Sequence, residues 1–100
     1  MKVVINTCFG GFSLSRQAWS ALKELGHPTA LADKDDGTNA FCYNMQRSDP
    51  QLVEVVAALG DKADGLHAQL AIIDIPDGIS WHIEDYDGQE WIAEDHRTWR

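Results

Sequence analysis

Apolar residues recur at helical spacing in two stretches of the chain. In the first, Ser13 or Ser15 precedes the repeat as a helix cap, and Gly26 follows it where a left-handed residue is wanted. The predicted buried face consists of Leu14, Ala18, Ala21 or Leu22, and Leu25. Residues 27–39 combine His27-Pro28 with a run of polar residues and glycine, which is typical of a loop.

The second stretch predicts a helix from residue 50 to residue 59. Asp49 can cap it, Pro50 suits the first helical position and Gly60 can end it. Its predicted buried positions are Leu52, Val55, Val56 and Leu59.

Short apolar runs and alternating positions predict five strands. They cover residues 2–6, 40–45, 68–75, 79–86 and 89–94. Because residues 68–75 carry apolar side chains on both faces, that strand is expected inside a sheet.

The last two predicted strands form a hairpin around Asp87-Gly88, a strong signal for a two-residue turn. This turn sets the register, which pairs Ile83 with Ile92, Glu84 with Trp91, and Asp85 with Glu90. Trp81 and Trp91 then fall on opposite sides of the hairpin, so at least one of them is expected outside the core.

The predicted order β-α-β-α-β-β-β favours an α+β fold: a two-layer arrangement with a sheet of about five strands and two helices on one face. The length of 100 residues predicts a single domain over residues 1–100. No apolar run could span a membrane, and residues 1–5 are too short for a signal peptide, so we expect a cytoplasmic protein with free thiols at Cys8 and Cys42.

The charge is concentrated in the second half of the chain. The net charge is −8, and the acidic and basic residues of residues 1–50 balance, so residues 51–100 carry the whole excess. This excess would repel the phosphates of nucleic acid and attract a basic surface, although plain solubility would also explain it.

A glycine-rich segment between the first strand and the first helix is a candidate ligand loop. It comprises Cys8, Phe9, Gly10, Gly11 and Phe12. Glycines before a helix N-terminus can admit an anion, but the segment fits neither the dinucleotide nor the phosphate-loop pattern, which favours a sharp turn. A catalytic Cys8 would need a base and an orienting group, and no nearby histidine signature supplies them, so we assign no catalytic residue.

The sequence predicts no metal and no cofactor. Zinc ligands usually occur in close pairs, whereas Cys8 and Cys42 are far apart. The acidic residues from Asp33 to Gly37 suggest calcium, but an EF-hand needs glycine and glutamate at positions where this loop lacks them.

Four acidic residues surround the predicted hairpin turn and form the candidate partner-binding surface. They are Glu84, Asp85, Asp87 and Glu90. Like charges on opposite strands destabilise a hairpin, so Asp85 facing Glu90 suggests an exposed contact surface rather than a structural need. On this interpretation, replacing both residues would leave the fold intact or slightly stabilise it.

Three segments resemble a family of small, uncharacterised phage- and prophage-encoded proteins: residues 2–15 (KVVINTCFGGFSLS), 47–53 (RSDPQLV) and 84–99, which contain EDYDG and HRTW. The resemblance implies a phage origin and action in the host cytoplasm, and it assigns no catalytic residue. It favours a non-enzymatic, anti-CRISPR-like inhibitor of a host factor or defence complex, with an acidic surface that binds a basic one. The alternative is a small-molecule binder, such as a sponge for nucleotide signals, that uses the loop of residues 6–15.

Overall fold

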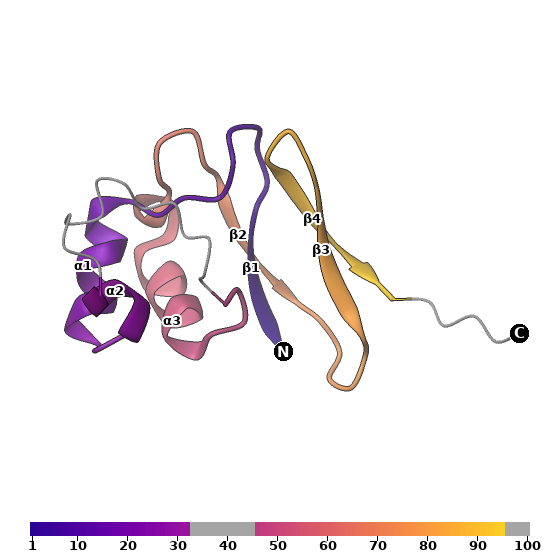
Figure 1. The fold of residues 1–100 in the computed structure, drawn as a ribbon, viewed down its shortest axis with the longest axis horizontal. Coiled ribbons are helices and arrows are strands. Elements are labelled where there is room, and N and C mark those ends of the chain that lie inside the picture. Colours follow the sequence, from indigo (N-terminus) through magenta and orange to yellow (C-terminus); the bar gives the residue numbers. More distant parts are fainter. Residues whose placement is uncertain (33–45, 96–100) are drawn as a thin grey trace, which may run out of the picture.

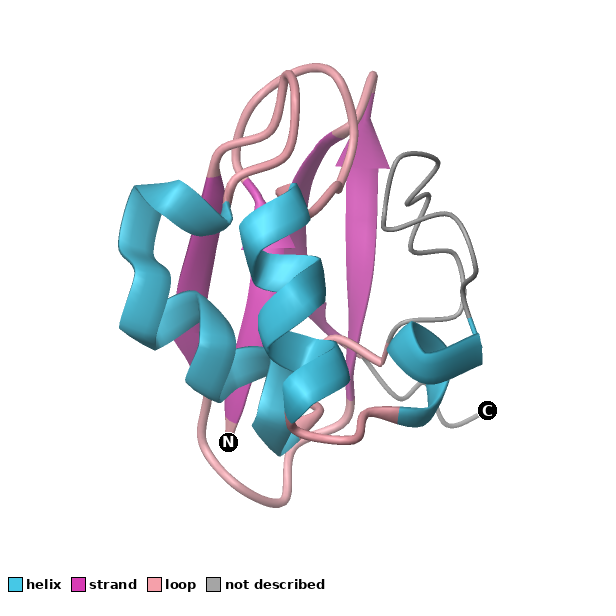
Figure 2. Ribbon diagram, turned by 90° about the vertical axis from the view of Figure 1, so that its left-hand side faces the viewer, coloured by secondary structure: helices cyan, strands magenta, loops and turns pink. Residues whose placement is uncertain are grey.

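The computed structural model describes residues 1–32 and 46–95 and arranges them in three layers (Figure 1). Helices form one layer, a two-stranded sheet forms the middle layer, and a β-hairpin forms the third. Figure 2, turned by a right angle, shows the helices in front of the strands. The elements are β1 (Lys2–Asn6), α1 (Arg16–Glu24), α2 (Pro28–Ala32), α3 (Pro50–Leu59), a 3-10 helix η1 (Gly60–Ala63), β2 (Leu70–Asp74), β3 (Trp81–Tyr86) and β4 (Gln89–Glu94).

The middle layer is formed by β1 and β2, which pair in antiparallel fashion with Val4 opposite Ile72. Side chains alternate between the two faces of this sheet. Val4 packs in the helical core with Leu22 and Leu52, whereas Val3 and Ile5 pack toward the hairpin. The two faces of β1 therefore belong to two separate hydrophobic cores.

The caps predicted for the two longer helices are confirmed. The Ser15 side chain accepts a hydrogen bond from the backbone of Ala18, and the Asp49 carboxylate accepts from the backbone N–H groups of Gln51 and Leu52. These bonds satisfy amide groups that the first turn of a helix leaves unpaired. The predicted buried face of α1 is correct at Ala18 and Leu22, but Leu25 is exposed and Trp19 is buried in its place.

The hairpin is confirmed with its predicted turn and register. Asp87 and Gly88 have φ angles of 49° and 90°, which a two-residue turn of this kind requires. Ile83 pairs with Ile92, Glu84 with Trp91 and Asp85 with Glu90. The face that carries Trp81, Ile83 and Ile92 covers the sheet opposite the helices.

The α+β class is confirmed, but the single five-stranded sheet is not. The described residues form four strands in two antiparallel pairs, β1–β2 and β3–β4. The strand predicted at residues 40–45 lies outside the described residues. The hairpin folds over the sheet because its own apolar face needs cover, which adds a third layer to the two that we expected.

Two further predictions are wrong. The loop predicted after Gly26 contains α2, which begins at Pro28 and buries Ala30 against the helical core. The strand predicted inside a sheet is β2, which has β1 as its only strand partner among the described residues. The helices cover one face of β2 and the hairpin covers the other, which explains its apolar pattern.

Candidate functional site

The four acidic residues predicted as one binding surface lie on different sides of the hairpin. Glu84 faces away from the sheet, as does its partner Trp91, because side chains alternate along each strand. Asp85 and Glu90 lie on the opposite face, at the end nearest the turn, and Asp87 is in the turn itself. The hairpin therefore does not bring the four carboxylates together.

Glu90 is a structural residue rather than an exposed contact. Its carboxylate oxygens accept hydrogen bonds from both terminal nitrogens of Arg47, at 2.6 and 2.8 Å. The side chain of Glu90 is only 10% exposed and that of Arg47 18%. The expectation that Glu90 is free for a partner is wrong, because this paired geometry occupies both oxygens.

The Arg47–Glu90 pair covers the edge of β1 that faces away from β2. Glu90 Oε1 accepts a hydrogen bond from the Asn6 backbone at 2.8 Å, and the Arg47 carbonyl accepts one from the Val4 backbone at 2.9 Å. The guanidinium also lies 3.6 Å from the centre of the Phe12 ring. One ion pair thus joins the segment before α3, the first strand and the hairpin.

The glycine-rich segment contacts the hairpin turn. The Gly10 backbone N–H donates to the Asp87 carbonyl at 3.2 Å, and Asn6 Nδ2 donates to the Gly88 carbonyl at 2.7 Å. These bonds occupy groups that an anion would need, and Arg47 lies over Phe12. The geometry therefore fits a close-packed turn better than an open ligand loop.

Two other members of that segment, Cys8 and Phe9, are at least partly accessible. Cys8 is half-buried, and its thiol donates to the His67 carbonyl at 3.0 Å. Phe9 is exposed. The recorded contacts of the thiol among the described residues are to the His67 carbonyl and the Asn6 side chain, and none is to a histidine ring.

An ordered polar and aromatic surface covers the outside of the hairpin. We call it the outer hairpin face and define it by His82, Glu84, Tyr86 and Trp91. Trp91 is 44% exposed and Tyr86 67%. Trp91 Nε1 donates to Glu84 Oε2 at 3.1 Å, which holds the indole in one orientation.

His82 is the only basic side chain of this face and lies between two carboxylates. Its Nε2 is 2.9 Å from Glu84 Oε1, and its Nδ1 contacts Asp95 Oδ1. Hydrogen bonds to Glu84 and then to Asp95 raise the pKa of His82 above 6.5. Protonated His82 therefore links the two strands, since Glu84 lies on β3 and Asp95 directly follows β4.

We expect this link to make the stability of the hairpin depend on pH. Since the pKa of folded His82 exceeds 6.5, its contribution is fully present below about pH 6.5 and is lost as the pH rises through the higher folded pKa. The free energy of unfolding of the wild type should exceed that of His82→Gln more at pH 6 than at pH 9. Urea denaturation of both proteins at the two pH values would measure the difference.

Two glutamates of the hairpin, Glu84 and Glu94, allow a test of what raises the pKa of His82. Glu84→Gln should lower the pKa of His82 measured by NMR, because Glu84 is its principal partner. Glu94→Gln should leave it nearly unchanged, since Glu94 pairs with Trp81 on the other face. An equal pKa of His82 in the folded and the urea-unfolded protein would contradict the assignment.

The donors next to His82 bond to carboxylates rather than to the imidazole. Ser80 Oγ donates to Asp95 at 2.7 Å, and Trp91 Nε1 donates to Glu84. Over residues 1–32 and 46–95, no three His, Cys, Asp or Glu side chains are placed to hold a metal ion. No helix in the same ranges is long and apolar enough to cross a membrane. What the face offers is a fixed aromatic ring beside carboxylates.

Sequence reasoning missed Arg47 and the His82–Asp95 contact. Arg47 lies 43 residues from Glu90, and no local pattern connects them. The His82 cluster had a usable signal, because the predicted register places residue 82 two positions from Glu84 on one face.

Comparisons with protein-family models, curated proteins and solved structures gave no match.

Proposed function

We propose that this protein acts by binding, and that its outer hairpin face docks on a basic surface of a partner protein. The observation that carries the proposal is Trp91, a partly exposed indole held by Glu84 on the same face of the hairpin as the exposed ring of Tyr86. Rigid tryptophan and tyrosine side chains provide much of the energy of many interfaces. They lose little conformational entropy on binding when they are already fixed.

The charge of this region gives the partner its expected chemistry. Residues 74–95 contain eight acidic residues and no lysine or arginine. Asp85 and Asp87 are exposed beside the outer hairpin face, whereas Glu90 is not available. Such a surface favours a partner rich in lysine and arginine and disfavours nucleic acid.

The resemblance to phage proteins adds a biological setting to the proposal. In that setting the protein is a phage accessory factor in the host cytoplasm, and its partner is a host factor or defence complex that it inhibits. Covering a basic groove with the outer hairpin face would block nucleic acid from the same groove. Inhibition of this kind needs no catalytic residue.

Trp91→Ala tests the proposal directly. We expect the variant to fold and to lose only about 1 kcal/mol of stability, because part of the indole is exposed and its one hydrogen bond goes to the half-exposed Glu84. It should bind the partner more weakly by about 2 kcal/mol, or roughly thirtyfold. The partner would be captured from a host lysate with the wild type, identified by mass spectrometry and titrated against both proteins by calorimetry.

Leu31→Ala is the matched control, since Leu31 is 60% exposed on α2 in the helical layer. It should capture the same partner with the affinity of the wild type. Binding by the wild type should also weaken as salt is added. Equal binding by the wild type and Trp91→Ala would refute the proposed role of the outer hairpin face.

A further inference from the structure

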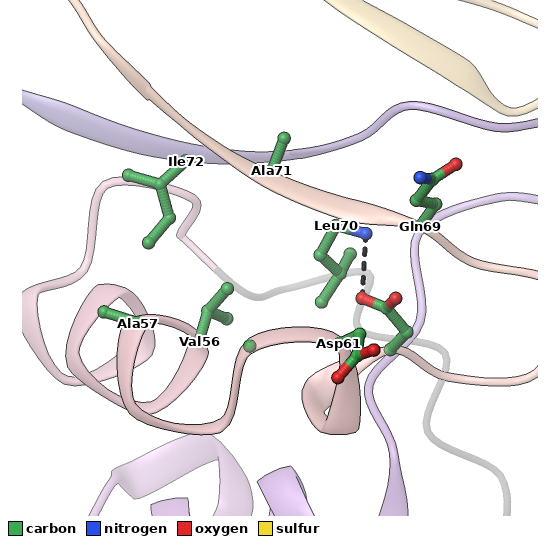
Figure 3. Close-up of a pocket in the computed structure, with 9 residues that line it drawn as sticks. Val56, Ala57, Asp61, Gln69, Leu70, Ala71 and Ile72 are labelled. Atoms are coloured by element: carbon green, nitrogen blue, oxygen red, sulfur yellow. Dashed lines mark hydrogen bonds between the residues drawn. The ribbon is translucent and has the colours of Figure 1, made fainter.

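A groove lies on the side of the molecule away from the outer hairpin face, between α3 and β2 (Figure 3). It has a volume of about 370 Å³. Val56 and Ala57 line it from the helix, and Leu70 and Ile72 line it from the strand. Figure 3 shows Leu70 and Ile72 directed from β2 toward the helix, with Asp61 at the end of the groove.

The groove runs beside a strand edge that is open in the described part of the chain. Hydrogen-bonded and non-hydrogen-bonded pairs alternate in an antiparallel ladder. Met1 and Ile75 exchange both backbone bonds, and the Thr7 N–H donates to the Gln69 carbonyl at 2.7 Å. The pairs between them at Val4–Ile72 and Asn6–Leu70 must therefore direct their backbone groups away from each other.

Contacts on the outer sides of both strands agree with this alternation. The Val4 N–H donates outward to the Arg47 carbonyl. On β2, the Leu70 N–H donates outward to Asp64 Oδ1 at 2.9 Å, which Figure 3 draws as a dashed line. No described residue similarly pairs with the backbone N–H or carbonyl of Ile72 on that side.

We propose that the open edge of β2, together with the adjoining groove, binds an extended basic peptide segment of a partner protein as an added strand. The backbone of such a segment would pair with the Ile72 N–H and carbonyl. Every second side chain of the segment would enter the groove, because side chains of a strand alternate. This surface is separate from the outer hairpin face and does not depend on its role.

Charge selects a basic segment over a second copy of this chain. Asp61 is exposed at one end of the edge, where it lines the groove. Asp74 at the other end is also exposed, but its carboxylate already lies 3.6 Å from the N-terminal ammonium, so Asp61 supplies the charge that attracts the segment. Lys62 is next to Asp61 but does not line the groove. Two copies with a net charge of −8 each would repel one another and bring the same acids together.

The probe is a short capped peptide of alternating valine and lysine, added to the ¹⁵N-labelled full chain. We expect its binding to shift the amide signal of Ile72 and to slow hydrogen exchange at that amide. The same peptide with methylated backbone nitrogens should bind far more weakly, since methylation removes the donors that pair with β2. Equal binding of the methylated peptide would overturn strand addition.

Substitutions on α3 and η1 test the groove itself. Asp61→Asn should weaken binding of the valine-lysine peptide roughly two- to fivefold, the range for one exposed ion pair, whereas Glu54→Gln on the outside of α3 should not. Ala57→Met should also weaken it by filling the groove. Amide signal shifts confined to the hairpin residues on adding the peptide would overturn the proposal. It would also be overturned if the chain formed a concentration-dependent dimer in which hydrogen exchange at the Ile72 amide were slow without any peptide.

Discussion

Glu90→Gln should destabilise the protein by about 3 kcal/mol, the cost of removing one partner from a largely buried ion pair. The substitution leaves Arg47, whose side chain is only 18% exposed, with no carboxylate opposite its guanidinium. It also weakens the acceptor for the Asn6 backbone N–H at the edge of β1. A domain of this size has a total stability of only about 5–15 kcal/mol, so the loss should be plain in urea denaturation.

Asp85→Asn is the matched control because Asp85 faces Glu90 across the hairpin. It removes one negative charge from the cross-strand pair of Asp85 and Glu90, as Glu90→Gln does, but leaves every contact of Arg47 in place. We expect this variant to be as stable as the wild type or slightly more stable, since it relieves a like-charge pair. The sequence-based expectation for replacing both residues therefore applies to Asp85 alone.

A double variant separates the effect of losing the Arg47–Glu90 ion pair from the effect of leaving one buried charge without a partner. Arg47→Met combined with Glu90→Leu removes both charges, and should cost less than either charge-removing substitution alone, because no charge remains buried without a partner. If Glu90→Gln were as stable as Asp85→Asn, the ion pair would contribute nothing and the proposed structural role of Glu90 would be wrong.

The features predicted correctly from the sequence depend on neighbouring residues. Helix caps at Ser15 and Asp49 act within three residues, and the Asp87-Gly88 turn sets its own register. Caps and tight turns of this kind can be predicted from the sequence because the residues that determine them lie within about one turn of the chain. The α+β class follows from the order of these elements.

The failed predictions concern contacts between distant segments. The apolar pattern of β2 requires cover on both faces, but it does not say whether strands or other layers supply the cover. The hairpin supplies it on one side, and that depends on how the chain turns after Ile75. Arg47 is likewise an ordinary surface residue by sequence until the fold brings Glu90 within 2.6 Å.

Part of the candidate site could be predicted from the hairpin register, whereas the face of the hairpin that is covered could not. The register alone separates Glu84 and Trp91 from Asp85 and Glu90, because side chains alternate along a strand. It does not reveal which face is covered. That information comes from Val3 and Ile5 on β1, which pack against Ile83 and Ile92.

The contact between the hairpin turn and the glycine-rich segment makes Gly88 a position where no side chain fits. Its φ of +90° is unfavourable for any residue with a Cβ. A Cβ there would lie 2.8 Å from Gly11 Cα and 2.9 Å from the Gly10 nitrogen, and would also meet the Gly11 nitrogen. These are backbone atoms, so they cannot rotate out of the way as a side chain could.

Gly88→Ala should therefore destabilise the protein more than backbone strain alone explains. Gly78→Ala provides the reference, because Gly78 has a similar φ of +85° and open space around it. We expect Gly78→Ala to cost about 1–3 kcal/mol from strain, and Gly88→Ala about 2 kcal/mol more from overpacking against the loop. Urea denaturation would measure the difference in stability. The Gly10 amide donates to the Asp87 carbonyl, so faster hydrogen exchange at that amide in Gly88→Ala would show that the turn has separated from the loop. Equal costs for the two variants would mean that the loop does not press on the turn, and the segment of residues 8–12 would again be open to a ligand.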